Sequence, residues 1–298
     1  MTAPRDLLDL VRAPAALSVP GDVIAGAAAG GVLGRRTVGL ACASVCLYWA
    51  GMAANDWADR RLDAVERPER PIPSGRVPAG AALGVAVGLT AAGLAVAGLA
   101  GGRRALAVAV PLAAAVWAYD VAAKGTRAGP LTMALCRTLD VLLGTAPALS
   151  TRHVADALPA AVTVGAHTYL LTALSRAEVS GTGPRLPALT LSGTVALAAV
   201  TARGGASPDR AAVTVRTGVS LTQPALAAWY AAQFGLSQAR AVADPRAGRV
   251  RDAVSAGIVS LPALQAALTA RAGAARVALA LWAAVPLARR LVRRISAT

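Results

Sequence analysis

The stretch Asn55-Asp56-Trp57-Ala58-Asp59-Arg60-Arg61-Leu62-Asp63 closes a long apolar run and carries three carboxylates. On a helix, Asp56, Asp59 and Asp63 occupy positions i, i+3 and i+7 and therefore share one face. Repeated carboxylates suit Mg²⁺, which usually binds phosphates at the same time. A solvated, charged loop is the alternative. The shared face and the downstream Arg-Pro-Ile-Pro-Ser-Gly (Arg70 to Gly75) favour a binding site.

The composition of the whole chain indicates a membrane protein. Its 298 residues are 56% hydrophobic and only 3% aromatic, and the mean hydropathy is +0.55. A helix needs about 20 apolar residues to cross a bilayer. We therefore expect an all-α integral membrane protein, a single domain over 1–298 with nine to ten transmembrane helices. The candidate spans are 13–34, 37–54, 79–100, 104–119, 130–150, 157–175, 187–202, 211–235, 253–270 and 273–291.

The net charge of +15 is interpreted by position along the chain, because a basic membrane protein is not a default nucleic-acid binder. With the N-terminus in the cytoplasm and ten helices, most basic residues fall in loops on the cytoplasmic side. Ten helices also place the tail residues Arg289, Arg290, Arg293 and Arg294 on that side. The N-terminal segment does not resemble a cleaved signal peptide. We predict a multi-pass protein of the cytoplasmic (inner) membrane, with no nucleic-acid partner.

Three informative loops fall on this same side. The first begins at Asn55 and ends near Pro78. The second contains Tyr119, Asp120 and Lys124, and Lys124 is the only lysine in the chain. A single lysine among so many arginines favours a requirement for a compact point charge, although chance is the alternative. The third loop reads Ser175-Arg176-Ala177-Glu178-Val179-Ser180-Gly181.

Asn-Asp-x-x-Asp-x-x-x-Asp followed by Arg-Pro-Ile-Pro-Ser-Gly resembles the first aspartate-rich motif of the UbiA superfamily of intramembrane prenyltransferases. The resemblance implies helices around a central cavity, capped by cytoplasmic loops, with a last helix (273–291) added to the family core. It also implies a prenyl diphosphate substrate, Mg²⁺ and a lipophilic acceptor that enters from membrane lipid. Tyr119 and Lys124 approximate the motif of the second loop with one additional residue, which leaves Asp120 and Lys124 as an alternative working pair.

The third loop departs from the family pattern, because a second aspartate-rich motif is expected there. Glu178 is its only acid, and the sequence around it is similar to that of a divergent, EboC-like branch. Arg176 would then supply charge where a second metal usually sits. The sequence is compatible with a site for one metal ion and with a site for two.

The resemblance assigns roles to the candidate residues. Mg²⁺ would be held by Asn55, Asp56 and Asp59, with Glu178 as a further ligand and Asp63 either ligating the metal or ordering the loop. Breaking the allylic C–O bond requires neutralisation of the diphosphate, for which basic side chains are suited. The residues expected to contact diphosphate or to act in catalysis are Arg67, Arg70, Tyr119, Asp120, Lys124, Arg127 and Arg176.

Charged residues inside apolar runs form a second candidate group, because each is costly unless it is paired or faces a cavity. Arg137 and Asp140 lie three residues apart, and Asp22 follows a Pro-Gly pair. The functional interpretation places Arg137 on the cavity wall near diphosphate or acceptor. The alternative is an inert ion pair between Arg137 and Asp140.

Two other functions compete with a Mg²⁺-dependent prenyltransferase. A catalytically altered scaffold, or a lipid-binding or transport protein, would explain the missing second motif but not the complete first motif. A phosphatidyltransferase would require a glycine after Asp59, and Arg60 stands there.

Overall fold

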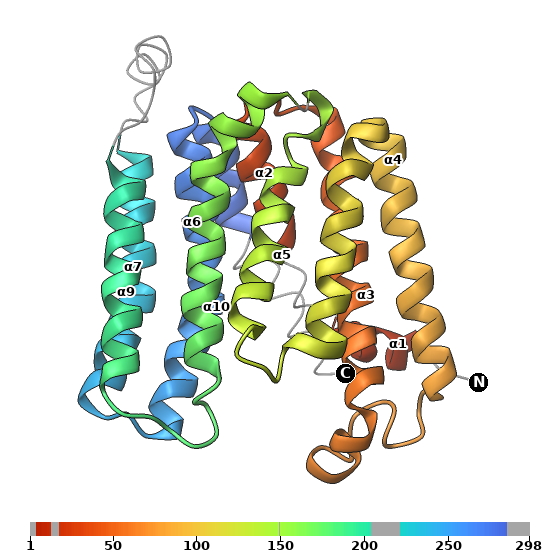
Figure 1. Cartoon of the computed structure of the whole chain (residues 1–298). Helices are drawn as coiled ribbons and strands as arrows, with labels where there is room; N and C mark the ends of the chain where they lie inside the picture. Colours follow the sequence, from red (N-terminus) through yellow and green to blue (C-terminus); the bar gives the residue numbers. More distant parts are fainter. Residues whose placement is uncertain (1–3, 13–17, 149, 204–220, 285–298) are drawn as a thin grey trace.

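The computed structural model describes residues 4–12, 18–148, 150–203 and 221–284, and these ranges contain helices and no strand. Figure 1 shows the long helices standing side by side in a bundle. The all-helical prediction is confirmed. A last helical stretch covers Ala275–Ala284. The other elements are α1 (Pro4–Leu10), α2 (Val19–Ala29), α3 (Arg35–Glu66), α4 (Ala79–Ala118), η2 (Tyr119–Ala123), α5 (Gly129–Leu143), η3 (Ala146–Ala148), α6 (Thr151–Ser175), α7 (Arg185–Ala202), α9 (Thr222–Ala243) and α10 (Ala247–Arg271).

Helix α4 is a helical hairpin with two antiparallel arms (Figure 1). Gly102 forms the turn with φ 64° and ψ −156°, a conformation that glycine adopts without a side-chain clash. Trp117 on the second arm donates to Thr90 Oγ1 on the first arm at 3.0 Å. In a straight helix these two residues would lie about 40 Å apart. The separate spans predicted at 79–100 and 104–119 therefore correspond to the two arms.

Helix α2, near the N-terminus, packs against helices from both halves of the chain. It packs against α3, α5, α6 and α10, so a short helix near the N-terminus contacts the long helix α10. Gly26 and Gly144 allow the closest approach, because a Cβ on Gly26 would lie 1.7 Å from Val141 O and one on Gly144 would lie 2.2 Å from Val23 O. Backbone contacts of this kind are typical of helix packing in membranes. They place α2 against the α5 face that carries Arg137.

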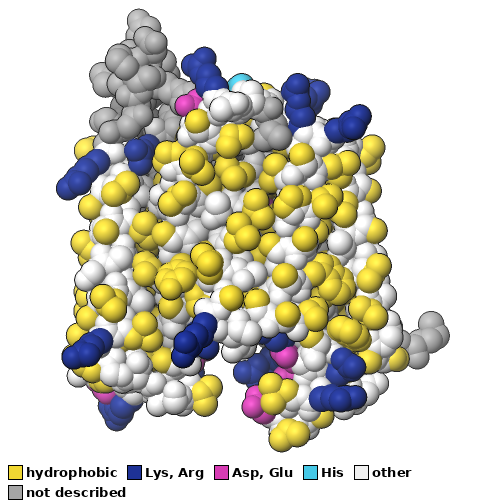
Figure 2. Space-filling model, viewed as in Figure 1, with side chains coloured by type: hydrophobic (Ala, Val, Ile, Leu, Met, Phe, Trp, Pro, Cys, Tyr) yellow, Lys and Arg dark blue, Asp and Glu magenta, His cyan; other side chains and the backbone are white. Residues whose placement is uncertain are grey.

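The surface pattern of the bundle agrees with a multi-pass membrane protein. Among the described helices, α3, α4 with η2, α6, α7 and α10 are long and apolar enough to cross a bilayer, whereas α2 and Ala275–Ala284 are apolar but shorter. Figure 2 shows hydrophobic side chains over the middle of the bundle and Lys and Arg at its two ends. The predicted spans 13–34, 130–150, 211–235 and 273–291 lie in part outside the described residues.

The acidic motif is helical rather than part of a loop, which corrects the predicted first loop beginning at Asn55. Helix α3 continues to Glu66 because no helix-breaking residue intervenes before Pro68. The turns that follow α3, the η2 segment and the α6–α7 and α9–α10 connections meet at the lower end of the bundle in Figure 1. The common side predicted for the three loops is confirmed.

Candidate active site

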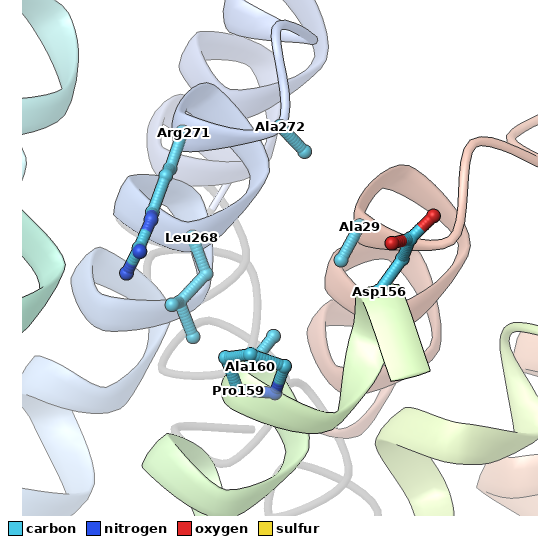
Figure 3. Close-up of a pocket in the computed structure, with 7 residues that line it drawn as sticks. All are labelled: Ala29, Asp156, Pro159, Ala160, Leu268, Arg271 and Ala272. Carbon is cyan, nitrogen blue, oxygen red and sulfur yellow. The ribbon is translucent and has the colours of Figure 1, made fainter. Parts of the chain in front are cut away.

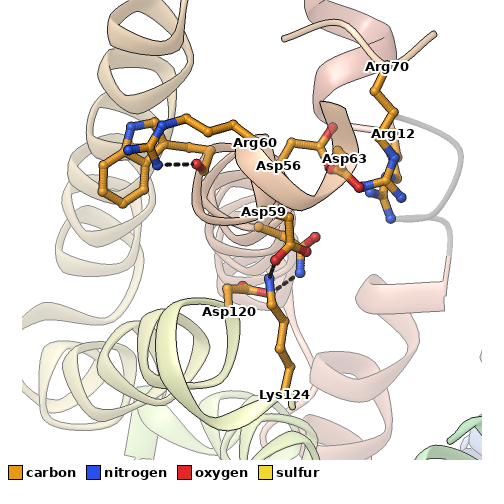
Figure 4. A network of polar contacts seen from close by, with 10 residues as sticks. Arg12, Asp56, Asp59, Arg60, Asp63, Arg70, Asp120 and Lys124 are labelled. Carbon is orange, nitrogen blue, oxygen red and sulfur yellow. Dashed lines mark hydrogen bonds and ion pairs between the residues drawn. The ribbon is translucent and has the colours of Figure 1, made fainter. Parts of the chain in front are cut away.

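The acidic end of α3 divides its carboxylates between two neighbours (Figure 4). At 100° per residue, Asp63 lies about 20° around the helix from Asp56, whereas Asp59 lies about 60° away. Asp56 and Asp63 are 3% exposed and face the chain that follows α3 and the end of the α1 segment. Asp59 faces η2. The single face expected from the spacing therefore serves two sets of basic partners.

Asp56 and Asp63 are held by two guanidinium groups. Arg70 Nη1 lies 2.6 Å from Asp63 Oδ2 and 3.4 Å from Asp56 Oδ1. Arg12 Nη2 donates to Asp56 Oδ1 at 2.6 Å. The Arg70–Asp63 pair orders the Arg-Pro-Ile-Pro-Ser-Gly turn, as expected for one of the two roles considered for Asp63.

Arg12 reaches the site from the N-terminal segment, a contribution that sequence reasoning missed. Arg76 binds Asp6 Oδ1 at 2.9 Å and Asp9 Oδ2 at 3.0 Å, which attaches α1 to the turn after α3. Arg12 follows α1 with a φ of 44°, an uncommon value for a residue with a side chain. The charge pattern of Asp6, Asp9 and Arg76 was visible in the sequence, but their pairing was not.

The second predicted loop faces α3 through two polar contacts (Figure 4). Asn55 Nδ2 donates to Asp120 Oδ1 at 3.1 Å, and Lys124 Nζ lies 2.7 Å from Asp59 Oδ1. Residues 119–123 form a π-helical turn, in which Lys124 N bonds Tyr119 O at 3.0 Å. A π turn holds one residue more than an α turn, which accommodates the additional residue noted between Tyr119 and Lys124. Asp120 and Lys124 both face the acidic motif.

Gly51 completes this contact on α3. A Cβ at Gly51 would lie 2.6 Å from Val116 Cγ1 and 2.8 Å from Asp120 Oδ2. Gly51, Asn55 and Asp59 are spaced four residues apart and so occupy one side of α3. This spacing is the sequence signal that would have identified Gly51. Its absent side chain allows the end of α4 and η2 to approach the acidic motif.

The third loop meets the other two through basic side chains. Arg176 Nη1 donates to Thr126 O, which attaches the third loop to the second. Burial raises the pKa of Glu178, and Arg251 and Arg67 oppose this shift by electrostatic attraction. Glu178 therefore lies among guanidinium groups, and Arg251 from α10 is a neighbour that sequence reasoning missed. Arg127 is exposed in the turn after η2.

Arg137 pairs with Asp22 and not with Asp140, which corrects the ion pair considered from the sequence. Arg137 Nε lies 2.7 Å from Asp22 Oδ2, while Ser44 donates to Asp140 Oδ1. The pairing across helices follows from the close approach of α2 to α5. Arg137 is eight residues into α5, about 12 Å along the helix from Gly129. This buried network is thus distinct from the acidic motif.

A small pocket lies at the opposite end of the bundle, lined mostly by apolar side chains (Figure 3). Its volume is about 130 Å³, and among the described residues that line it Asp156 and Arg271 are charged. Arg271 donates to Val200 O at 3.1 Å and is thereby attached to α7. The lower edge in Figure 2, in contrast, is hollowed between groups of charged side chains. The carboxylates of the acidic motif and their basic partners lie at this lower end.

The donor set on α3 fits Mg²⁺. Mg²⁺ usually keeps several waters and binds one or two carboxylates plus substrate phosphates. Asp56 and Asp59 supply carboxylates, and the Asn55 hydrogen bond uses the amide nitrogen, which leaves the amide oxygen as a ligand. Within the described residues no cluster of three or more His, Cys, Asp or Glu side chains is arranged to hold a metal. A Mg²⁺ ion bound to these side chains would need further oxygen ligands from water or from a phosphate group.

This fold and site define a multi-pass helical membrane protein with carboxylates and basic side chains gathered at one end. Residues 16–178 match the family model described as the UbiA prenyltransferase family. The chain belongs to this family, as the acidic motif indicated.

Similarity to individual relatives covers shorter stretches. The chain is 36% identical over 88 residues to the bacteriochlorophyll synthase 33 kDa chain of Rhodobacter capsulatus, covering 30% of this chain and 29% of that protein. It is 46% identical over 90 residues to digeranylgeranylglyceryl phosphate synthase of Ignicoccus hospitalis, covering 29% of each. The chain thus matches about three tenths of the length of these curated relatives.

Solved structures share the fold over nearly the whole chain. A UbiA homolog from Aeropyrum pernix K1 has a TM-score of 0.64 at 20% identity, covering 85% of this chain and 96% of that one. A structure of digeranylgeranylglyceryl phosphate synthase has a TM-score of 0.61 at 15% identity, covering 92% and 99%. At these identities the similarity shows the fold alone.

Proposed function

We propose that the protein is a prenyltransferase that transfers an isoprenoid group from a prenyl diphosphate to a lipophilic acceptor, with Mg²⁺ as cofactor. The observation that carries the proposal is the contact between α3 and the η2 turn. There Asn55 donates a hydrogen bond to Asp120, and Asp59 forms an ion pair with Lys124. Family membership supports the reaction class. The site would face the cytoplasm from the inner membrane, since the basic loops gather at this end.

The reaction breaks the bond between C1 of the prenyl group and its phosphate oxygen, and C1 then bonds to the acceptor as an acceptor proton leaves. Asn55, Asp56 and Asp59 would hold Mg²⁺, which when bound neutralises charge on the leaving diphosphate. Lys124 and Arg70 would bind phosphate oxygens with charge-assisted hydrogen bonds. The apolar helices would hold the isoprenoid chain and keep water from the developing cation.

The test is a transfer assay in liposomes with labelled prenyl diphosphates of several chain lengths, with and without Mg²⁺. We expect a labelled lipid product that requires Mg²⁺ and disappears in Asp56→Ala. The acceptor would be identified by mass spectrometry of the product formed in a lipid extract. Absence of product at every chain length and with every acceptor would instead favour a lipid-binding scaffold.

A further inference from the structure

The carboxylates of the acidic motif all have basic partners within the chain. Arg12 and Arg70 bind Asp56, Arg70 binds Asp63, and Lys124 binds Asp59 (Figure 4). Three of these four contacts are 2.6–2.7 Å long. The side chains of Asp56 and Asp63 are each 4% exposed, so water replaces these partners poorly. Without ligands, the acidic and basic side chains of the site therefore neutralise one another in ion pairs.

This arrangement opposes the binding of either ligand alone. A divalent cation that binds Asp56 and Asp59 must compete with Arg12 and Lys124, and their displaced charges would then lie beside the metal. A diphosphate that binds the basic groups would leave buried carboxylates unpaired beside further negative charge. Unpaired buried charge is strongly unfavourable. Only when both ligands are present does each displaced group gain a new partner.

We propose that the site works by partner exchange, in which a divalent cation and a diphosphate replace the internal ion pairs together and therefore bind with strong positive coupling. The inference rests on the proposed function and adds how the binding of one ligand changes the affinity for the other. Arg12 belongs to this exchange as the partner of Asp56, although it comes from the segment after α1 and not from any of the three loops. Coupling between two ligands is typically about 5- to 150-fold in affinity.

Arg12 provides the sharpest test, because its removal has opposite effects on the two ligands. In Arg12→Gln, Asp56 loses its 2.6 Å partner and becomes a better cation ligand. We expect the affinity for the divalent cation alone to rise about two- to fivefold, the strength of a partly exposed ion pair. The affinity for diphosphate should fall, and the coupling between the ligands should weaken. A merely structural role for Arg12 would lower both affinities.

The experiment measures binding to the full chain in nanodiscs, without turnover. Mn²⁺ replaces Mg²⁺ so that electron paramagnetic resonance reports the bound cation, and unreactive prenyl thiolodiphosphates of several chain lengths replace substrate. Each ligand is titrated alone and with the other, with solution complexes subtracted from a protein-free titration. We expect each ligand to bind at least about fivefold more tightly when the other is present. Equal affinities with and without the partner ligand would overturn the proposal.

Two variants guard against misfolding and nonspecific charge effects. Arg60→Gln is the matched control, since Arg60 lies 4.8 Å over the Trp57 ring and donates to Trp57 O instead of a carboxylate. It should leave both affinities and the coupling unchanged. Lys124→Gln repeats the Arg12 test at Asp59 and should also raise the affinity for Mn²⁺ alone. If thiolodiphosphates of every chain length fail to bind under all conditions, the proposed function fails; if both ligands bind independently, only partner exchange fails.

Discussion

Lys124 Nζ lies 2.7 Å from Asp59 Oδ1, and this ion pair joins the π-helical turn of η2 to the acidic end of α3. Both side chains are about one quarter exposed, at 23% and 24%. Lys124 Nζ itself is buried, but an ion pair between partly exposed side chains is weak enough to exchange with a ligand. The only lysine of the chain thus stands beside a predicted metal ligand.

Replacing Lys124 by arginine should impair turnover while keeping the charge. The planar guanidinium would place its donors differently from the compact ammonium group. A displacement of about 1 Å at a reacting group lowers the rate about 100-fold, which sets the expected loss of kcat. Diphosphate release in liposomes measures it, with Arg60→Lys as the control. Wild-type kcat in Lys124→Arg would remove Lys124 from its assigned role.

Asp56 and Asp59 should differ in their effects on stability although both are predicted metal ligands. Asp56→Asn leaves Arg12 without its ion-pair partner and Arg70 with Asp63 alone, and we expect the free energy of unfolding to fall by about 1–3 kcal/mol. Asp59→Asn breaks a partly exposed pair and should cost less than about 1 kcal/mol. Repulsion among the carboxylates would by itself predict no loss of stability for either variant.

Thermal unfolding in detergent distinguishes the two variants, and Mn²⁺-dependent thiolodiphosphate binding tests their shared role. Both variants should lose that binding. Equal melting temperatures for Asp56→Asn and Asp59→Asn would show that the ion pairs of Asp56 do not contribute to stability. Retained binding in both would exclude these residues as metal ligands.

The sequence predicted the parts of the molecule that depend on local pattern. Apolar runs indicated the helices, and the spacing of Asp56, Asp59 and Asp63 predicted their orientation toward a common side. The π turn was visible only as an additional residue between Tyr119 and Lys124. Its hydrogen bond depends on how η2 packs on α3, which residue spacing does not specify.

Partners that are distant in the chain were the part that sequence could not supply. Arg137 had a plausible neighbour in Asp140, yet the close approach of α2 gives it Asp22. Arg12 likewise reaches Asp56 because α1 is attached to the turn after α3. Tertiary packing determines such pairs, and many basic residues along the chain were equally available by composition.

Gly51 should tolerate no side chain, because α3 and the end of α4 meet there. Gly51→Ala places a methyl group 2.6 Å from Val116 Cγ1 and 2.8 Å from Asp120 Oδ2. We expect a stability loss of about 1–3 kcal/mol from overpacking. The Asn55–Asp120 contact should open, and activity should fall with it.

Gly84→Ala is the matched control for Gly51→Ala. Gly84 lies in α4 with open space where a Cβ would stand, so alanine should stabilise its helix by about 0.5–1 kcal/mol. Melting temperature and diphosphate release should be measured for both variants. A neutral or stabilising Gly51→Ala would show that α3 and η2 adapt easily at this contact.

Glu178 tests whether the third loop participates in the reaction. Burial raises the pKa of Glu178, with Arg251 and Arg67 opposing the shift, so the fold disfavours its charged form. Its contribution to stability therefore becomes unfavourable as the pH rises through and above the usual range of a glutamate. Glu178→Gln should raise the melting temperature relative to wild type at pH 8 and leave it nearly unchanged at pH 4.

The same substitution should lower diphosphate release if Glu178 serves the site, so activity and stability would move in opposite directions at pH 8. Glu66→Gln is the control, since Glu66 is an exposed acid at the end of α3. It should change neither quantity. Full activity in Glu178→Gln together with a higher melting temperature would make Glu178 a destabilising residue without a role in catalysis. Among the acids of the site, the reaction would then depend on Asp120 and the carboxylates of α3.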